Sequence, residues 1–145
     1  MNAKKKNLML LNNRNVFLVD DDLIASRFNR KVLENLGEFD IIETESRPLT
    51  AIRFLEEKLE TKNALPGVIV VDLYMPEIDG FQFISKVEEL FQLHNILSAP
   101  EFILLSSSQE EGDFRQFQNT PSVKHFLSKP LVLNEMKEVL EEMNL

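Results

Sequence analysis

Acidic residues follow directly on two apolar segments of the chain. Residues 15–26 read NVFLVDDDLIAS, so Asp20, Asp21 and Asp22 stand in a row behind VFLV, and Asp72 ends the apolar run VIVV. Clustered carboxylates in a chain without cysteine favour a hard cation, and Mg²⁺ is the expected one because it combines one or two carboxylates with waters and phosphate oxygens. A carboxylate that ends a buried strand can also accept a phosphoryl group as an acyl phosphate.

A serine run and a lysine offer the remaining groups for phosphoryl chemistry. FILLSSS places Ser106, Ser107 and Ser108 behind an apolar run, and FLSKP places Lys129 before Pro130. Phosphoryl transfer needs positioning and positive charge around the equatorial oxygens of the phosphoryl group. Mg²⁺, the Lys129 ammonium and the Ser106 hydroxyl are therefore the expected contacts.

The aspartate run also has a purely structural explanation. An aspartate in front of a helix caps its first backbone amides, and acids in the first turn interact favourably with the helix dipole. Asp22 suits capping better than metal binding. For Asp20 and Asp21, the presence of Asp72 and Lys129 elsewhere in the chain favours the metal site.

Short apolar segments of strand length alternate with helical patterns along the whole chain. Nearly unbroken apolar runs are typical of strands that are buried on both faces of a parallel sheet. Alternation of strands and helices predicts right-handed crossovers and helices on both faces of that sheet. Ligands of such folds bind at the carboxyl ends of the strands, where the polar residues above would meet. The expected strands are residues 16–20, 39–42, 68–72, 102–106 and 123–127.

Two of the helical intervals lead to specific expectations. Ile24, Phe28, Val32 and Leu36 recur every four residues and predict a helix with that apolar stripe, which stops at Gly37. The interval 109–119 has only two large apolar residues and contains a glycine, so its helix should be short and relatively mobile.

Composition sets the limits of these interpretations. The chain has 145 residues, which suits one domain, and its net charge of −8 argues against nucleic-acid binding. The absence of cysteine excludes disulfides and thiolate sites, and an intracellular protein is consistent with it. The apolar run 8–11 is too short to span a membrane. We expect residues 1–13 to be a tail and residues 14–145 to be the domain.

The four motifs FLVDDD, VIVVDLYMPEIDG, FILLSSS and FLSKP, in this order and at these spacings, resemble the receiver domain of two-component response regulators. The resemblance covers nearly the whole chain, from about residue 15 to residue 145. It implies a flavodoxin-like, doubly wound (βα)5 fold of the α/β class, a three-layer sandwich with parallel strands in the order 2-1-3-4-5.

The same resemblance implies roles for the acidic residues. Asp72 matches the phosphoacceptor. Asp21 would bind Mg²⁺ directly and Asp20 would bind it through water. Tyr74 occupies the position whose backbone carbonyl completes the metal site.

It also implies how a phosphoryl group would be held and sensed. Ser106 matches the switch hydroxyl, here in place of the commoner threonine, and Lys129 matches the lysine that pairs with the phosphoryl group. Pro130 follows that lysine, and the bond between them is commonly cis in the family. Phe126 stands where many members carry a tyrosine that moves inward on activation, so the phenolic hydrogen bond would be lost.

The expected function is that of a stand-alone cytoplasmic receiver of the chemotaxis type, a monomer or weak dimer. A histidine kinase or histidine phosphotransfer protein would phosphorylate Asp72 in a Mg²⁺-dependent reaction. The signal would leave through an unknown downstream protein, by way of the fourth helix, fifth strand and fifth helix. We expect a signalling phosphoacceptor rather than an enzyme, with only self-catalysed phosphorylation and slow autodephosphorylation.

Two alternatives remain open from the residues. A pseudo-receiver would use the same fold as an interaction module without phosphorylation. A phosphohydrolase of the haloacid dehalogenase type would use an Asp-x-Asp pair, which Asp20 and Asp22 superficially match, although no threonine follows at the expected spacing.

Overall fold

The computed structural model describes residues 11–107 and 110–143. Its strands form one parallel sheet in the order β2-β1-β3-β4-β5. This confirms the predicted fold class and strand order. The strands are β1 (Leu11–Val19), β2 (Ile41–Glu45), β3 (Leu65–Asp72), β4 (Glu101–Ser106) and β5 (Val123–Ser128).

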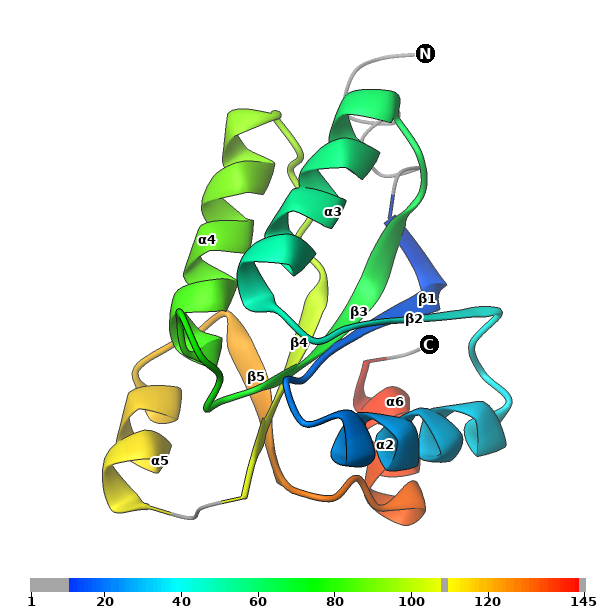
Figure 1. The fold of residues 1–145 in the computed structure, drawn as a ribbon, viewed down its shortest axis with the longest axis vertical. Helices are drawn as coiled ribbons and strands as arrows, with labels where there is room; N and C mark the ends of the chain where they lie inside the picture. The colour runs from blue at the N-terminus through cyan, green and yellow to red at the C-terminus, as the bar shows by residue number, and fades with distance from the viewer. Residues whose placement is uncertain (1–10, 108–109, 144–145) are drawn as a thin grey trace.

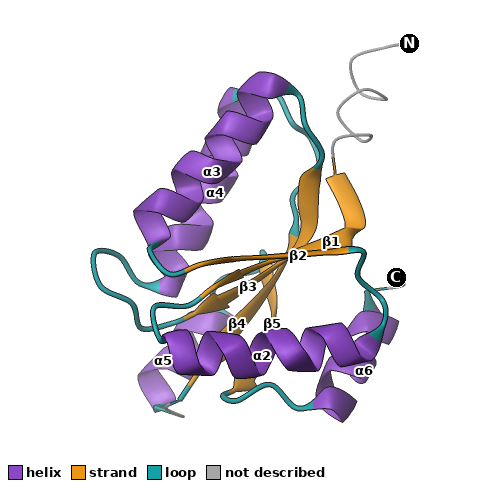
Figure 2. Ribbon diagram, turned by 45° about the vertical axis from the view of Figure 1, so that its right-hand side comes forward, coloured by secondary structure: helices purple, strands orange, loops and turns teal. Residues whose placement is uncertain are grey.

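Helices cover both faces of the sheet, with α3 and α4 on one face and α2 and α6 on the other (Figures 1 and 2). None of the helices in the described ranges is long and apolar enough to cross a membrane. The helices are α2 (Leu23–Leu36), α3 (Pro48–Thr61), α4 (Gly80–Leu93), α5 (Glu111–Gln118) and α6 (Leu133–Glu142).

The apolar runs of the strands supply a hydrophobic core to each face. In β1, Phe17 and Val19 belong to the core under α3 and α4, whereas Val16 and Leu18 belong to the core under α2 and α6. Successive side chains of a strand point to opposite faces, so a strand buried on both sides must be apolar at every position. This explains why VFLV shows no alternation.

The bounds of all five strands differ from the expected ones. β3 begins at residue 65 rather than 68, β4 begins at 101 rather than 102, and β5 ends at 128 rather than 127. β1 begins at Leu11, because Leu11 pairs with Leu65 of β3, so residues 11–13 of the expected tail are part of the sheet. Residues 1–10 of that tail lie outside the described residues. β2 spans residues 41–45 rather than 39–42, because its partner in β1 aligns Asn15 with Ile41.

The apolar stripe expected for α2 was half wrong. Ile24 is 83% exposed and Phe28 is 52% exposed, whereas Val32 and Leu36 pack against the core as predicted. The face of α2 that turns inward carries Ser26, Asn29 and Leu33. A polar position, Asn29, therefore occupies the centre of the buried face, and a period of four could not reveal it.

Candidate functional site

Three carboxylates meet at the carboxyl edge of the sheet. Asp20 follows β1, Asp72 ends β3, and these two strands are neighbours. One carboxylate oxygen each from Asp20, Asp21 and Asp72 lies within 4.8 Å of the others. Asp20 and Asp72 are buried, whereas Asp21 is exposed and can be reached from solvent. Oxygen donors of this kind, open on one side, fit a hard cation such as Mg²⁺.

Lys129 lies between the two buried acids. Its Nζ is 2.9 Å from Asp20 Oδ2 and 3.3 Å from Asp72 Oδ2, and its side chain is largely buried. Burial lowers the pKa of the Lys129 ammonium, but the bonds and charges of Asp20 and Asp72 outweigh burial, so its pKa is raised overall. Lys129 therefore stays charged and offsets part of the repulsion between the carboxylates.

Asp72 is the perturbed acid of the cluster. Its burial and, next, the charge of Asp20 raise the pKa of its carboxyl to about 7, against the opposing effect of Lys129. The carboxyl thus titrates near neutral pH, where a second positive charge beside it would favour the ionised, nucleophilic form.

Asp22 has a different task from its two neighbours. Its Oδ1 accepts hydrogen bonds from the backbone N–H groups of Ile24 and Ala25, at 3.0 and 3.1 Å, and it is the N-cap of α2. The predicted capping role is confirmed. Among the described residues, the carboxylate cluster consists of Asp20, Asp21 and Asp72, without Asp22.

The turn behind Asp72 is held tightly against the sheet. The Gly80 N–H donates to the Leu73 carbonyl at 2.7 Å, and a Cβ on Gly80 would lie 2.9 Å from the Asp72 carbonyl oxygen. The Asp79 carboxylate accepts from the Gln82 N–H and the Gln82 side chain accepts from the Asp79 N–H, which caps α4. Close packing of this turn fixes the backbone that carries Asp72.

Ser106 and the Lys129–Pro130 pair lie at the neighbouring strand ends. Ser106 is completely buried at the end of β4, and its carbonyl accepts from the Lys129 N–H at 2.9 Å. The bond between Lys129 and Pro130 is cis, as the resemblance implied. The structure therefore brings Ser106 and Lys129 to the edge that holds the acids.

Tyr74 and Phe126 link this edge to α5. The Tyr74 hydroxyl donates to the Asp113 carboxylate of α5, and that bond raises the pKa of Tyr74 to about 12. The Phe126 ring of β5 lies 5.4 Å from the Phe117 ring and 6.4 Å from the Phe114 ring, between centroids. Sequence reasoning missed the Tyr74–Asp113 bond, because no pattern joins residues 39 positions apart.

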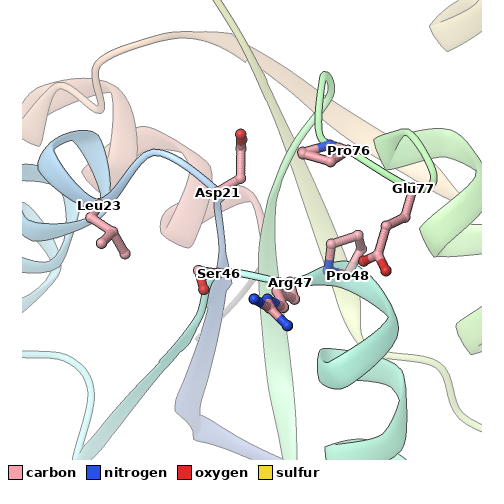
Figure 3. A pocket seen from close by; sticks show the side chains of 7 residues that line it. All are labelled: Asp21, Leu23, Ser46, Arg47, Pro48, Pro76 and Glu77. Atoms are coloured by element: carbon pink, nitrogen blue, oxygen red, sulfur yellow. The ribbon is translucent and has the colours of Figure 1, made fainter.

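A cavity of about 460 Å³ opens beside the exposed member of the acidic cluster. It lies where the loops behind β1, β2 and β3 converge, and Figure 3 shows its side chains arriving from these separate segments. The acidic edge is thus open on the side of Asp21. The lining residues are Asp21, Leu23, Ser46, Arg47, Pro48, Pro76 and Glu77.

Comparisons with known proteins agree on one family. The model of the response regulator receiver domain matches residues 16–141. The probable methanogenesis regulatory protein FilR2 of Methanothrix harundinacea is 26% identical over 127 residues, which are 88% of this chain and 79% of FilR2. The KDP operon transcriptional regulatory protein KdpE of Escherichia coli is 32% identical over 85% of this chain, but this chain matches only 48% of KdpE.

Solved structures give the same answer. A two component response regulator from Cytophaga hutchinsonii has a TM-score of 0.79 and 26% identity to this chain, and the match covers 90% of this chain and 97% of that one. Strand order, the acidic edge and the matching family model all point in one direction. This chain belongs to the response regulator receiver domain family of two-component systems.

Proposed function

We propose that this receiver domain accepts a phosphoryl group on Asp72 from a histidine kinase or a histidine phosphotransfer protein, in a reaction that requires Mg²⁺. The observation that carries the proposal is the meeting of the Asp20, Asp21 and Asp72 carboxylates at one edge, with the Lys129 ammonium against Asp20 and Asp72. Carboxylates that are buried together beside a cation, one of them with a strongly raised pKa, mark a candidate functional site.

The chemical step is a transfer between two nucleophiles. A carboxylate oxygen of Asp72 forms a bond to phosphorus, the bond from phosphorus to the donor's imidazole nitrogen breaks, and the imidazole keeps the electron pair. The product is an acyl phosphate on Asp72. No water or redox partner takes part, so the chain acts as a phosphoacceptor rather than as an enzyme on a separate substrate.

Each group at the edge has a task in that step. The carboxylates of Asp20, Asp21 and Asp72 and the Tyr74 carbonyl would hold Mg²⁺, which supplies positive charge to the phosphoryl oxygens. Lys129 already lies within 3.3 Å of the Asp72 carboxylate and adds a second positive charge. The Ser106 hydroxyl, at the end of the neighbouring strand β4, would bind a phosphoryl oxygen.

The signal would leave the domain through α5 and β5. Phosphorylation changes the charge at an edge that contacts α5 through Tyr74 and β5 through the Ser106 strand end. A bound phosphoryl group would shift the population between two arrangements of Ser106, Phe126 and α5, and a downstream protein would recognise one of them.

The test is intact-mass spectrometry after incubation with a small-molecule phosphodonor and Mg²⁺. The protein should gain the mass of one phosphoryl group, and hydroxylamine, which cleaves acyl phosphates, should remove it. Asp72→Ala should gain nothing. Asp40→Ala changes an exposed aspartate that pairs with Arg14 far from the site, and it should behave as the unchanged protein.

Two outcomes would reject the proposal. One is the absence of any added phosphoryl mass with Mg²⁺ present, which would favour a pseudo-receiver that acts by binding alone. The other is an added phosphoryl group that persists in Asp72→Ala, which would place the acceptor elsewhere.

A further inference from the structure

A buried asparagine of α2 contacts the loop that carries Lys129. Asn29 is completely buried, and its Oδ1 accepts a hydrogen bond of 3.0 Å from the backbone N–H of Leu131. Leu131 is buried as well, and the two residues are 102 positions apart in the chain. The bond thus joins the first described helix to the segment that follows β5.

The Nδ2 group of Asn29 shows that an asparagine at this position lowers the stability of the fold. Asn29 Nδ2 is buried, and no group within the described ranges accepts a hydrogen bond from it. An unsatisfied buried donor destabilises a fold, whereas an apolar residue at this position would pack against the core that contains Leu33. The benefit of an asparagine must therefore lie in the bond to Leu131.

That bond is one of two that fix the loop around Lys129. On one side the Lys129 N–H donates to the Ser106 carbonyl at 2.9 Å, and on the other the Leu131 N–H donates to Asn29. The acceptor residues of both bonds, Ser106 and Asn29, are completely buried. Between them the Lys129 side chain reaches Asp20 and Asp72.

The helix that supplies the second anchor also sets the position of Asp20. α2 begins at Leu23, its N-cap is Asp22, and the Asp22 N–H donates to Asp20 Oδ1 at 2.9 Å. The same helix, α2, therefore contacts both the turn that carries Asp20 and the loop that carries Lys129. A shift of the Lys129 loop away from α2 would break the hydrogen bond between Leu131 and Asn29.

We propose that Asn29 is a positioning residue that holds Lys129 against Asp20 and Asp72 through the backbone of Leu131. The consequence for phosphoryl transfer rests on the proposed function. The structural part, that Asn29 fixes the loop at Leu131, does not rest on it.

The experiment replaces Asn29 with leucine, which fills similar space and removes the acceptor. The rate of phosphorylation by a small-molecule phosphodonor should fall by about ten- to a hundredfold, since small displacements of a reacting group have effects of that size. Mg²⁺ affinity should stay within about twofold, because the three carboxylates are untouched. Leu33→Ala, on the same buried face of α2, is the matched control and should leave the rate per folded molecule unchanged.

A second background separates positioning of Lys129 from a general loss of structure. In Lys129→Ala protein, Asn29→Leu should cause no further fall in the rate, because the residue through which it acts is gone. The proposal is overturned if the fall persists undiminished in that background, or if Leu33→Ala lowers the rate as much. If Asn29→Leu folds too poorly to assay, Asn29→Ser, whose hydroxyl lies nearer the backbone, replaces it.

Amide hydrogen exchange makes the structural part independent of phosphorylation. The Leu131 amide should lose its protection in Asn29→Leu and keep it in Leu33→Ala. If the unchanged protein takes no phosphoryl group but Leu131 behaves in this way, the proposed function fails and the positioning role stands. If Leu131 keeps its protection in Asn29→Leu, the positioning role fails whatever the phosphorylation assay shows.

Discussion

Two helices that follow neighbouring strands of the site, α4 and α5, are held in very different ways. α4 has 14 residues, a capping box formed by Asp79 and Gln82, and seven buried residues. α5 has eight residues, all of them within the described ranges; none is buried, and its N-cap Glu110 makes no side-chain capping bond. The helix behind Asp72 is thus part of the core, whereas the helix behind Ser106 lies on it.

The contrast gives the two helices different parts in the proposed switch. Regions with few buried contacts open at a lower free energy than the core does. α5 contacts the rest of the domain through the rings of Phe114 and Phe117, which lie against Phe126, and through the bond from Tyr74 to Asp113. A small change at the acidic edge can therefore move α5 without disturbing α4, which keeps Asp72 in place.

Truncation of one phenylalanine in each helix should give the largest difference. Phe83 of α4 is completely buried, so Phe83→Ala should lower the free energy of unfolding by about 3–5 kcal/mol. Phe114 of α5 is 48% exposed, so Phe114→Ala should cost about 1 kcal/mol or less. Urea unfolding measures both, and equal losses would show that α5 is as much a part of the core as α4.

Replacing the glycine near the start of each helix with alanine should change the free energy of unfolding in opposite directions. A Cβ on Gly80 of α4 would meet Leu104 Cδ1 at 2.6 Å and the Asp72 carbonyl oxygen at 2.9 Å, so Gly80→Ala should cost about 1–3 kcal/mol. A Cβ on Gly112 of α5 meets nothing within 4 Å, so Gly112→Ala should gain about 0.5–1 kcal/mol. Thermal unfolding of the two variants measures both, and a loss of stability in Gly112→Ala would contradict the open environment of α5.

This contrast could be predicted only in part from the sequence. The small number of apolar residues in 109–119 predicted a short helix, and α5 is indeed short; its mobility stays a prediction. The bond between Tyr74 and Asp113 could not be foreseen, because it depends on the path of the loop between β3 and α4. In α2, the inward position of Asn29 depended on a loop 102 residues away. Ile24 and Phe28, the first half of the expected stripe, were assigned to the wrong face, whereas Val32 and Leu36 were assigned correctly.

The acidic edge was more predictable than the helices. Parallel strands bring their carboxyl ends together, so the positions of Asp20, Asp72 and Lys129 followed from the strand assignments alone. Errors of a few residues at the strand starts, as at Leu11, did not move these ends. The bond from the Leu131 N–H to Asn29 could not be predicted in this way, because it joins residues 102 positions apart and leaves no local sequence pattern.

The titration of Asp72 tests the buried part of the acidic edge, next to α4, in the absence of metal. Its folded-state pKa, about 7, lies above its ordinary value, so the folded protein binds more protons than the unfolded chain between those two pH values. Stability should therefore fall as pH rises from about 4 to 7. Asp72→Asn should remove this part of the fall and stabilise the protein by about 1–2 kcal/mol at pH 8 in a chelating buffer.

Asp113→Asn is the matched change in α5, because Asp113 is only half-buried and an asparagine keeps an acceptor for Tyr74. Because Asp113→Asn leaves Asp72 in place, the fall in stability that Asp72 causes between pH 5 and pH 8 should remain. The comparison fails if Asp72→Asn shows the same stability difference between pH 5 and pH 8 as the unchanged protein.

Addition of Mg²⁺ should offset the repulsion among the carboxylates of Asp20, Asp21 and Asp72. A cation that binds only the folded protein stabilises it by about 1.4 kcal/mol at ten times its dissociation constant, so millimolar Mg²⁺ should raise the melting temperature. The rise should be lost in Asp21→Ala, which removes the exposed carboxylate of the cluster, and should persist in Asp113→Asn. No rise in the unchanged protein would return the aspartate run to its structural explanation as acids in front of a helix.

The smallest expected effect concerns the hydrogen bond from Tyr74 to Asp113, which joins the acidic edge to α5. Tyr74→Phe keeps the ring and removes the hydroxyl that donates to Asp113, so the free energy of unfolding should fall by only about 0.5–1 kcal/mol. Hydrogen exchange should localise that loss, with faster exchange of α5 amides and no change in α4. Unchanged exchange in α5 would mean that its phenylalanines alone hold it. Since Tyr74 follows Asp72 by two residues, faster exchange confined to α5 would identify this hydroxyl as the direct connection between the acidic edge and the loosely held helix.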